Sequence, residues 1–368
     1  MIIGFDAKRA FHNYAGLGNY SRLLIDSLSN LYSNNHYFLY TPAYNFHPLH
    51  DFANPINCSI ITPKGIDALL PSSYWRSFSM VNHINTQNID IFHGLSGELP
   101  ISTLKMPKIV TIHDLIFERY PKFYTGFDRK MYKKKFKHAC NVADKIITIS
   151  KQTADDCIRF LEADSKKIEI VYQGCDPIFH KPQKNEDVLK KYDFPEKFIL
   201  NIGTIEERKN VLNLVKAMKF IDEEVTLVVI GRKTSYTSLI ETYIKENNLT
   251  HSVKLMHHIP FRDFPSIYAA ASAFVYPSVF EGFGIPILEA LAVGTPVATS
   301  NLSSMPEVGG DAALYFNPYH IEDIADKINL LLNDQKVVAK LNENRKIQLE
   351  KFSVKNIAAK VNTIYSCL

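Results

Sequence analysis

Long apolar runs and paired cysteine motifs are absent from this chain of 368 residues. No stretch approaches the roughly 18 apolar residues that a helix needs to cross a bilayer, and Met1–Asp6 turns polar too early for a secretory signal. The five cysteines are odd in number and include no Cys-x-x-Cys pair, which argues against a zinc or dithiol centre. We therefore expect reduced thiols and a cytoplasmic location, with peripheral attachment at the inner face of the cytoplasmic membrane as an open hypothesis.

A large charge of one sign is also missing, because 42 Lys and Arg residues oppose 38 Asp and Glu residues and leave a net charge of +4. So small an excess does not require a nucleic-acid partner, and we expect none. Hydrophobic residues make up 46% and charged residues 22% of the chain, which excludes disorder, collagen and coiled coil. Ordinary globular domains remain, and at roughly 150 residues each the length predicts about two of them.

Short apolar runs alternate with longer segments of helical period, a pattern typical of βαβ units with parallel sheets. The first series of expected strands is Ile2–Asp6, Tyr37–Tyr40, Ser59–Thr62, Ile89–Phe92, Ile109–Ile112, Lys145–Ile149 and Ile168–Val171. The second series is Phe198–Ile202, Val225–Ile230, Val253–Leu255, Ala273–Val275 and Pro296–Ala298. Helices are expected between them at Tyr20–Leu31, Arg129–Ala143, Val211–Phe220, Ser238–Asn247, Phe264–Ala270 and Ile285–Val293.

Between the two series, Gly174 and Pro177 interrupt both periods, and a polar stretch follows them. We place the domain boundary here, with residues 1–176 as the N-terminal domain and residues 177–352 as the C-terminal domain. From about His320 the pattern predicts consecutive helices. The last of them, Ser353–Tyr365, has an apolar face that needs a surface to cover.

The most informative segment, residues 276–290, contains two carboxylates, Glu281 and Glu289. Pro286 fits the first turn of a helix, which places Glu281 in the preceding loop and Glu289 about one turn inside the helix. Carboxylates accept hydrogen bonds from vicinal hydroxyls, so the pair suits a sugar or ribose ring better than a metal. Favourable charge near a helix N-terminus would explain Glu289 alone, but not the glycines beside Glu281, which are Gly282 and Gly284.

A second segment follows the expected strand Phe198–Ile202, where Gly203 leads to the adjacent cations Arg208 and Lys209. Asn210 is expected to cap the next helix. Cations are unfavourable at a helix N-terminus because the helix dipole repels them. A strongly anionic ligand would explain their presence, and a solvated surface pair is the alternative.

Near the N-terminus, Gly16 and Gly18 lie in an expected loop ahead of a helix, where backbone N–H groups can approach a phosphate. As a dinucleotide fingerprint the loop fails, because the third glycine position is Ser21. His113 ends an apolar strand, at the edge where α/β sheets bind ligands, and Asp114 is a candidate to orient its ring.

Four lysines follow one ridge of the expected helix Arg129–Ala143 at helical spacing: Lys130, Lys133, Lys134 and Lys137. A solvated face is the simplest interpretation. Contact with anionic lipid or with a pyrophosphate-linked acceptor is the alternative. His47 with His50, and His257 with His258, lack further ligands at metal spacing, so we expect no metal site.

The carboxylate segment, with Gly294-Thr295-Pro296 and Pro306-Glu307-Val308 after it, resembles the retaining nucleotide-sugar glycosyltransferases of family 4. Within that family it looks most like mannosyltransferases of bacterial surface-polysaccharide synthesis. The resemblance covers nearly the whole chain. It implies the GT-B fold, in which two Rossmann-like domains with parallel sheets face each other across a cleft. It also implies that the last helix, about residues 353–368, crosses back to the first domain.

The resemblance also implies a role for each candidate residue. Glu281 would bind hydroxyls of the donor sugar, and Glu289 would hold the nucleotide ribose. Arg208 and Lys209 would stabilise the diphosphate, and His113 would lie near the reacting centre. The remaining donor-binding positions, which act through backbone groups or close approach, would be Gly16, Gly18, Gly203, Gly282, Phe283, Gly284, Ile285 and Pro286.

Two departures from the family pattern are visible. Thr204 stands where many members have an arginine, which removes one cation from the diphosphate loop, and Val354 stands where the last helix often has an aromatic residue. No Asp-x-Asp occurs, which agrees with leaving-group stabilisation by Arg208 and Lys209 without a metal or other cofactor.

The expected activity is retaining transfer of a hexose, with mannose from GDP-mannose favoured and UDP-glucose open. The expected acceptor is a glycan or a polyprenyl-pyrophosphate-linked saccharide in surface-polysaccharide or O-antigen synthesis. A sugar-nucleotide epimerase of the same fold would use the same phosphate sites, but would alter the donor without an acceptor. A non-enzymatic module for anionic membranes would depend on the lysine ridge alone. An NAD-dependent dehydrogenase is disfavoured by the broken glycine fingerprint.

Overall fold

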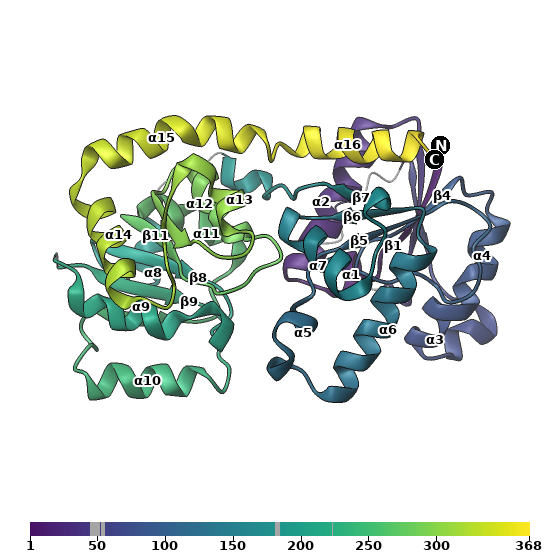
Figure 1. Ribbon diagram of the computed structural model, residues 1–368. Helices are drawn as coiled ribbons and strands as arrows, with labels where there is room; N and C mark the ends of the chain where they lie inside the picture. Colours follow the sequence, from purple (N-terminus) through teal and green to yellow (C-terminus); the bar gives the residue numbers. More distant parts are fainter. Residues whose placement is uncertain (45–51, 53–55, 181–184, 223) are drawn as a thin grey trace. The chain divides into compact units, whose positions relative to one another are not determined.

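The structure is a computed structural model that describes residues 1–44, 52, 56–180, 185–222 and 224–368 (Figure 1). The chain divides into two compact units. Unit 1 comprises Met1–Gly174 and Ser353–Leu368, and unit 2 comprises Cys175–Phe352. The boundary placed after residue 176 lies two residues from this division. His47 and His50 lie outside the described residues.

Unit 1 is built on a seven-stranded sheet whose strands are all parallel, in the order β3-β2-β1-β4-β5-β6-β7. Its strands are β1 (Ile2–Asp6), β2 (His36–Tyr40), β3 (Cys58–Ile61), β4 (Ile91–Gly94), β5 (Lys108–Ile112), β6 (Lys145–Thr148) and β7 (Ile168–Ile170). The connections reverse direction between β1 and β4, as in Rossmann-like sheets. The expected strand Ile89–Phe92 is shifted by two residues toward Gly94.

The helices of unit 1 include the last helix of the chain, α16, which packs on α2 (Figure 1). The unit contains α1 (Lys8–His12), α2 (Gly16–Leu31), α3 (Ser72–Tyr74), α4 (Met80–Thr86), α5 (Ile116–Arg119), α6 (Gly126–Val142), α7 (Lys151–Leu161) and α16 (Val354–Ser366). Short turns lie at η2 (Gly65–Leu69), η3 (Trp75–Ser79), η4 (Pro121–Phe123) and η5 (Ser165–Lys167). The apolar face expected on the last helix is buried, with Ile357, Val361 and Ile364 at helical spacing. The return of this helix to the N-terminal domain is therefore observed.

Unit 2 has a six-stranded parallel sheet in the order β10-β9-β8-β11-β12-β13. Its strands are β8 (Phe198–Ile202), β9 (Thr226–Ile230), β10 (Val253–Met256), β11 (Ala273–Tyr276), β12 (Val297–Ser300) and β13 (Ala313–Phe316). Its helices are α8 (Glu186–Lys191), α9 (Val211–Ala217), α10 (Thr237–Glu246), α11 (Phe264–Ala270), α12 (Ile285–Val293), α13 (Met305–Gly309), α14 (Ile321–Asn333) and α15 (Gln335–Glu350). Short turns lie at η6 (Pro177–His180), η7 (Glu207–Lys209), η8 (Met218–Phe220), η9 (Phe261–Asp263) and η10 (Gly310–Ala312).

Strand β13 was not expected from the sequence. It is four residues long, Ala-Leu-Tyr-Phe, and contains no β-branched residue. All four of its residues pair with β12 in parallel register. The two parallel sheets confirm the α/β class.

Candidate functional site

In unit 2 the candidate residues follow two neighbouring strands at their carboxyl ends. The chain leaving β8 carries Gly203 and then Arg208 and Lys209, and the chain leaving β11 carries Glu281. Between β8 and β11 the strand order changes direction, with β9 and β10 on one side and β12 and β13 on the other. Loops at such a switch point separate and leave the crevice in which open α/β sheets bind ligands.

Glu281 forms ion pairs with both neighbouring cations. Its Oε2 lies 2.9 Å from Nη1 of Arg208, and its Oε1 lies 2.6 Å from Nζ of Lys209. The three side chains are only 12 to 14% exposed. Arg208 also pairs with Glu206, so two positive and two negative groups meet here. The sequence pattern favoured an anionic ligand for these cations, and the structure gives them an internal anionic partner as well.

The charges in this cluster determine the protonation of Glu281. Burial alone would raise the pKa of its carboxyl, but Lys209 and Arg208 outweigh burial and lower the pKa to about 2. Burial lowers the pKa of Lys209, while Glu281 counteracts part of that shift. At neutral pH, therefore, Glu281 is an anion.

Hydrogen bonds from Tyr276 and Ser278 fix the Glu281 carboxylate. The Ser278 hydroxyl donates to Oε1 over 2.6 Å, and the Tyr276 hydroxyl donates to the same oxygen over 3.0 Å. Lys209 Nζ in turn donates to the Tyr276 hydroxyl over 2.6 Å. The carboxylate is thus held in one orientation before any ligand arrives.

Two serines missed by the sequence analysis fasten the loop that carries Glu281. The hydroxyls of Ser303 and Ser304 donate to the Glu281 carbonyl over 2.7 and 3.0 Å. Ser304 also donates to the Phe283 carbonyl over 2.6 Å. Both serines follow β12, so their position after a neighbouring strand was the signal that could have found them.

Glu289 lies on the first turns of α12 and is 6% exposed. Its Oε2 accepts a hydrogen bond from the Tyr268 hydroxyl over 3.0 Å. Burial raises its pKa to about 7, an effect that Tyr268 opposes and the charge of Asp176 increases. Burial also raises the pKa of Tyr276, and the charges of Glu281 and Glu289 both add to that shift. Both carboxylates are therefore close enough to affect the same tyrosine.

The helix α12 begins and ends where the sequence predicted. Gly284 precedes it with φ of 113°, Pro286 lies in its first turn, and Gly294 follows it with φ of 101°. Such positive φ values favour glycine. Phe283 was expected at the donor site, but its ring is 3% exposed and packs edge-on against Phe352 at 5.6 Å. Only its backbone remains a candidate for ligand contact.

The local role of Asn210 differs from the prediction. It precedes α9 in a left-handed conformation with φ of 56°, and its side chain makes no capping hydrogen bond. Its amide instead donates to the Pro318 carbonyl over 2.7 Å, an arrangement that ties the β8 loop to a distant part of unit 2.

Gly203 has φ of 156°, and a Cβ there would lie 3.7 Å from the Lys209 side chain.

His113, in unit 1, follows β5 and is 8% exposed. Its Nε2 lies 2.9 Å from the Leu95 carbonyl, which accepts only, so Nε2 carries the proton. Burial lowers the pKa of the ring to about 4, so His113 is neutral at pH 7 and Nδ1 is an acceptor. Asp114 Oδ1 accepts the backbone N–H of Ile116 over 3.1 Å, and its role in orienting the ring stays a prediction.

The expected loop at Gly16 and Gly18 is instead the first turn of α2, which begins at Gly16. A Cβ on Gly18 would lie 1.7 Å from the Asn13 carbonyl oxygen, so this glycine is required for close backbone packing. A Cβ on Gly16 would meet no atom within 4 Å. Asn13 Oδ1 accepts the backbone N–H groups of Ala15 and Gly18 over 2.9 and 3.3 Å, so part of this helix N-terminus already has a partner within the chain.

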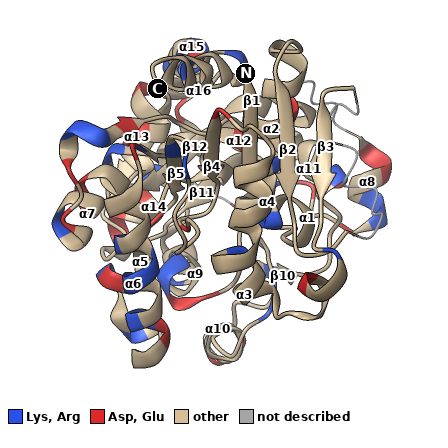
Figure 2. Ribbon diagram, turned by 90° about the vertical axis from the view of Figure 1, so that its right-hand side faces the viewer, with Lys and Arg blue, Asp and Glu red and all other residues tan. Residues whose placement is uncertain are grey.

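The lysine ridge of α6 is partly neutralised, and Figure 2 shows acidic segments near its basic ones. Lys133 pairs with Glu118 at 3.2 Å, and Lys137 pairs with Glu162 at 2.8 Å. Lys130 and Lys134 are exposed and have no ion pair within the described part of the chain. The four lysines therefore do not form one uniformly cationic surface.

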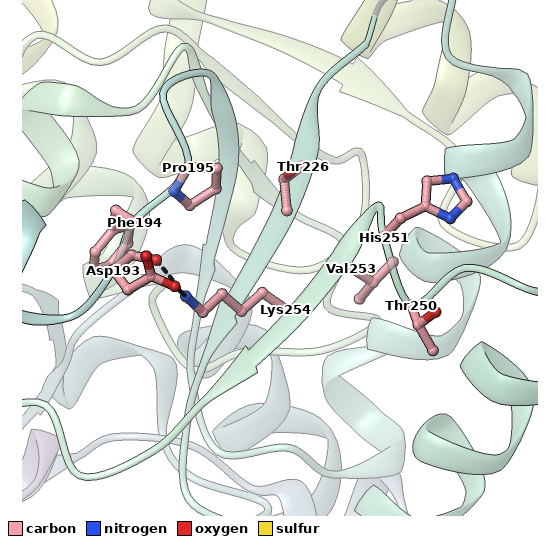
Figure 3. Close-up of a pocket in the computed structure, with 8 residues that line it drawn as sticks. All are labelled: Asp193, Phe194, Pro195, Thr226, Thr250, His251, Val253 and Lys254. Atoms are coloured by element: carbon pink, nitrogen blue, oxygen red, sulfur yellow. Dashed lines mark hydrogen bonds and ion pairs between the residues drawn. The ribbon is translucent and has the colours of Figure 1, made fainter.

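A hollow of about 460 Å³ lies at the opposite edge of the unit 2 sheet (Figure 3). Thr226 and Val253, the first residues of β9 and β10, line it together with the ion pair between Asp193 and Lys254. It is thus remote from the carboxyl ends of β8 and β11. Across the described residues, no cluster of three His, Cys, Asp or Glu side chains is able to hold a metal. No helix among them is long and apolar enough to cross a membrane.

Two family models match the chain. Residues 14–179 match Glycosyltransferase Family 4, and residues 182–348 match Glycosyl transferases group 1. O-antigen chain mannosyltransferase B of Escherichia coli is 30% identical over 286 residues, which are 76% of this chain and 74% of that protein.

Solved structures share the fold. Sucrose-phosphate synthase from Thermosynechococcus elongatus superposes with a TM-score of 0.76 at 20% identity, covering 100% of this chain and 98% of the other. HepE from Anabaena, solved with UDP and glucose, gives 0.75 at 17% identity, covering 100% and 99%. The expectation of a GT-B fold class with two Rossmann-like units is confirmed. This chain is therefore a glycosyltransferase and belongs to the family whose group 1 and family 4 models match its two halves.

Proposed function

We propose that this enzyme transfers a hexose from a nucleoside diphosphate sugar to a saccharide acceptor in the synthesis of a surface polysaccharide such as O-antigen. The observation that carries the proposal is the cluster of Arg208, Lys209 and Glu281 at the switch point of unit 2. Mannose from GDP-mannose is the favoured donor, because the relative from Escherichia coli is an O-antigen chain mannosyltransferase. HepE with bound UDP and glucose keeps UDP-glucose as the alternative.

The cluster can stabilise a leaving diphosphate without a metal. A diphosphate carries more negative charge than one carboxylate, so it competes with Glu281 for Arg208 and Lys209. Glu281 oxygens released in this way can accept hydrogen bonds from sugar hydroxyls. As the glycosidic bond breaks, negative charge grows on the phosphate, and both cations bind it more strongly than they bind the ground state.

We propose that the transfer retains the anomeric configuration, as the resemblance to retaining glycosyltransferases of family 4 implies. A carboxylate whose pKa is lowered to about 2 is a weak base and a poor nucleophile, which disfavours a covalent intermediate on Glu281. We infer attack on the face from which the phosphate leaves. The bond from the anomeric carbon to the phosphate breaks, a bond to the acceptor oxygen forms, and the phosphate takes the acceptor proton. His113 Nδ1 is available to accept a hydrogen bond from a substrate hydroxyl.

The acceptor is proposed to be a polyprenyl-pyrophosphate-linked saccharide, reached at an anionic membrane. Phe127 at the start of α6 is 76% exposed, and the exposed Lys130 and Lys134 follow it along the same ridge. An aromatic residue beside unpaired lysines suits the headgroup region. Co-sedimentation with vesicles of anionic or neutral lipid tests this contact. Equal pelleting of the parent chain and a Lys130→Glu, Lys134→Glu variant would contradict it.

The donor is tested by thermal shift with GDP, UDP, ADP and their sugars. A ligand at 100 times its dissociation constant should add about 2.7 kcal/mol to the free energy of unfolding. The selected sugar nucleotide is then incubated with and without a saccharide acceptor. Transfer with retention, undiminished by a chelator, supports the proposal. An altered sugar nucleotide formed without acceptor would instead indicate an epimerase.

A further inference from the structure

A row of hydrogen-bonded, buried polar side chains in unit 1 connects helix α16 with β5, the strand that precedes His113. The Tyr365 hydroxyl lies 2.7 Å from Nδ1 of His93, and Nε2 of His93 lies 2.8 Å from the Thr111 hydroxyl. The Thr111 hydroxyl in turn lies 3.3 Å from the Tyr20 hydroxyl. These four side chains are at most 6% exposed. Burying a polar group costs free energy unless it forms a hydrogen bond, so four buried polar side chains in one row suggest a role besides stability.

The direction of these hydrogen bonds follows from counting donors. Burial, together with the charge of His113, lowers the pKa of His93 to about 3, so the ring is neutral with one N–H. Among the described residues Tyr365 bonds only to His93, so its hydroxyl proton needs Nδ1 as acceptor. Tyr365 therefore donates to Nδ1, and Nε2–H of His93 donates to Thr111.

Two routes lead from this row to His113. The Tyr20 ring packs edge-on against the His113 ring, with centroids 4.7 Å apart at 86°. In addition, the Nε2–H of His113 donates to the carbonyl of Leu95. Leu95 directly follows β4, the strand that contains His93, and is two residues from His93. The backbone N–H of Gly97, two residues after Leu95, donates to the Thr111 carbonyl over 2.8 Å. His93 is thus linked to both contacts of the His113 ring.

We propose that Tyr365 and His93 are positioning residues, through which the C-terminal helix holds the His113 ring in the orientation that presents Nδ1 to a substrate hydroxyl. The inference rests on the proposed function, in which His113 contacts substrate. Tyr365 lies 272 residues from His93 in sequence, so the last helix contributes to the site from outside it. Small losses of alignment in such a contact are costly to turnover.

The first test is Tyr365→Phe, which removes one hydroxyl and keeps the ring. We expect kcat to fall about tenfold with the KM for the donor unchanged. The matched control is Tyr37→Phe in the same core, whose fully buried hydroxyl donates to the Leu28 carbonyl over 2.9 Å and not to His93. Both variants should lose similar stability, and only Tyr365→Phe should lose kcat. Equal loss of kcat in the two variants would show that the effect is structural.

Conservative changes at Thr111 give an independent check. Thr111→Ser keeps the hydroxyl that accepts from His93 and should retain kcat, whereas Thr111→Val keeps the shape and should behave like Tyr365→Phe. A combined Tyr365→Phe, His113→Ala variant should be no slower than His113→Ala, because both changes act through one ring. Additive losses would overturn the proposal.

The nitrogen NMR signals of the imidazole rings separate this inference from the proposed function. In the parent chain His113 should show a protonated Nε2, and Tyr365→Phe should shift its signals while Tyr37→Phe leaves them in place. If the parent chain has no transferase activity, the proposed function is wrong, but the NMR comparison of the His113 signals still tests the positioning contact. Unchanged His113 signals in Tyr365→Phe would end the positioning role.

Discussion

Lys209 and Glu281 are 72 residues apart in sequence, yet their side chains meet at 2.6 Å. The fold brings them together because β8 and β11 are neighbours in the unit 2 sheet and both loops leave at the carboxyl end. Glu281 opposes the lowering of the Lys209 pKa by burial, and Lys209 helps to keep the buried Glu281 ionised. A diphosphate that enters this pair meets two cations already held in place.

Replacing both cations tests their role in stabilising the leaving group. One preorganised donor is worth roughly 3 kcal/mol of barrier, so Arg208→Ala with Lys209→Ala should lower kcat by at least 100-fold. The measurement is initial-rate kinetics with donor and acceptor saturating. Lys254→Ala is the control, because Lys254 pairs with Asp193 at the other edge of the sheet and should keep full activity. Unchanged turnover in the double variant would contradict the assignment.

The pKa of Glu289 predicts a pH-dependent donor affinity. Burial raises this pKa to about 7, so the carboxyl takes up a proton as the pH falls from 8 to 6. A neutral carboxyl accepts hydrogen bonds from ribose hydroxyls less strongly, and the KM for the donor should rise about tenfold over that range. Glu289→Gln cannot titrate, so its KM should be raised and constant.

The titration of Glu289 should also make the free energy of unfolding depend on pH. The folded-state pKa of Glu289 lies above its ordinary value of 4.5, so the free energy of unfolding should decrease as the pH rises from 4.5 through 7. Glu289→Gln should lack that decrease in denaturant titrations. A variant with the parent's slope would show that Glu289 is not the group that titrates.

The elements of the fold were largely predictable because their signals are local. Gly284, Pro286 and Gly294 marked the limits of α12 by their own backbone preferences. Strand β13 carried a weak signal and depends on its pairing with β12, which is not local. Contacts made across the sheet therefore limit what sequence patterns predict.

The candidate site was predictable in its residue types but not in its contacts. The sequence marked Arg208, Lys209 and Glu281 separately, and only the sheet order shows that they pair with one another. Tyr268 gave no signal, because a lone hydroxyl in an apolar segment has no pattern of its own, and Ser304 gave only its position after β12. Their partners are set by tertiary packing.

Acid should destabilise unit 2 through Glu281. Its folded-state pKa of about 2 lies below the ordinary value of 4.5, so its stabilisation is present above pH 4.5 and is lost as the pH falls toward 2. Glu281→Gln should be less stable at pH 6 but should lose less stability between pH 4.5 and pH 2. Thermal melts of the two chains across this range measure the difference. Parallel melting curves would mean that the ion pairs add nothing.

The two glycines at the start of α2 should respond to alanine in opposite ways. A Cβ on Gly18 would lie 1.7 Å from the Asn13 carbonyl oxygen, so the backbone must move and Gly18→Ala should lower the Tm by several degrees. A Cβ on Gly16 meets nothing within 4 Å, and alanine is up to about 1 kcal/mol better than glycine in a helix. Gly16→Ala should therefore keep or raise the Tm. If this variant keeps its stability but the KM for the donor rises, Gly16 acts at the phosphates; if KM is unchanged, the helix start has no role in donor binding.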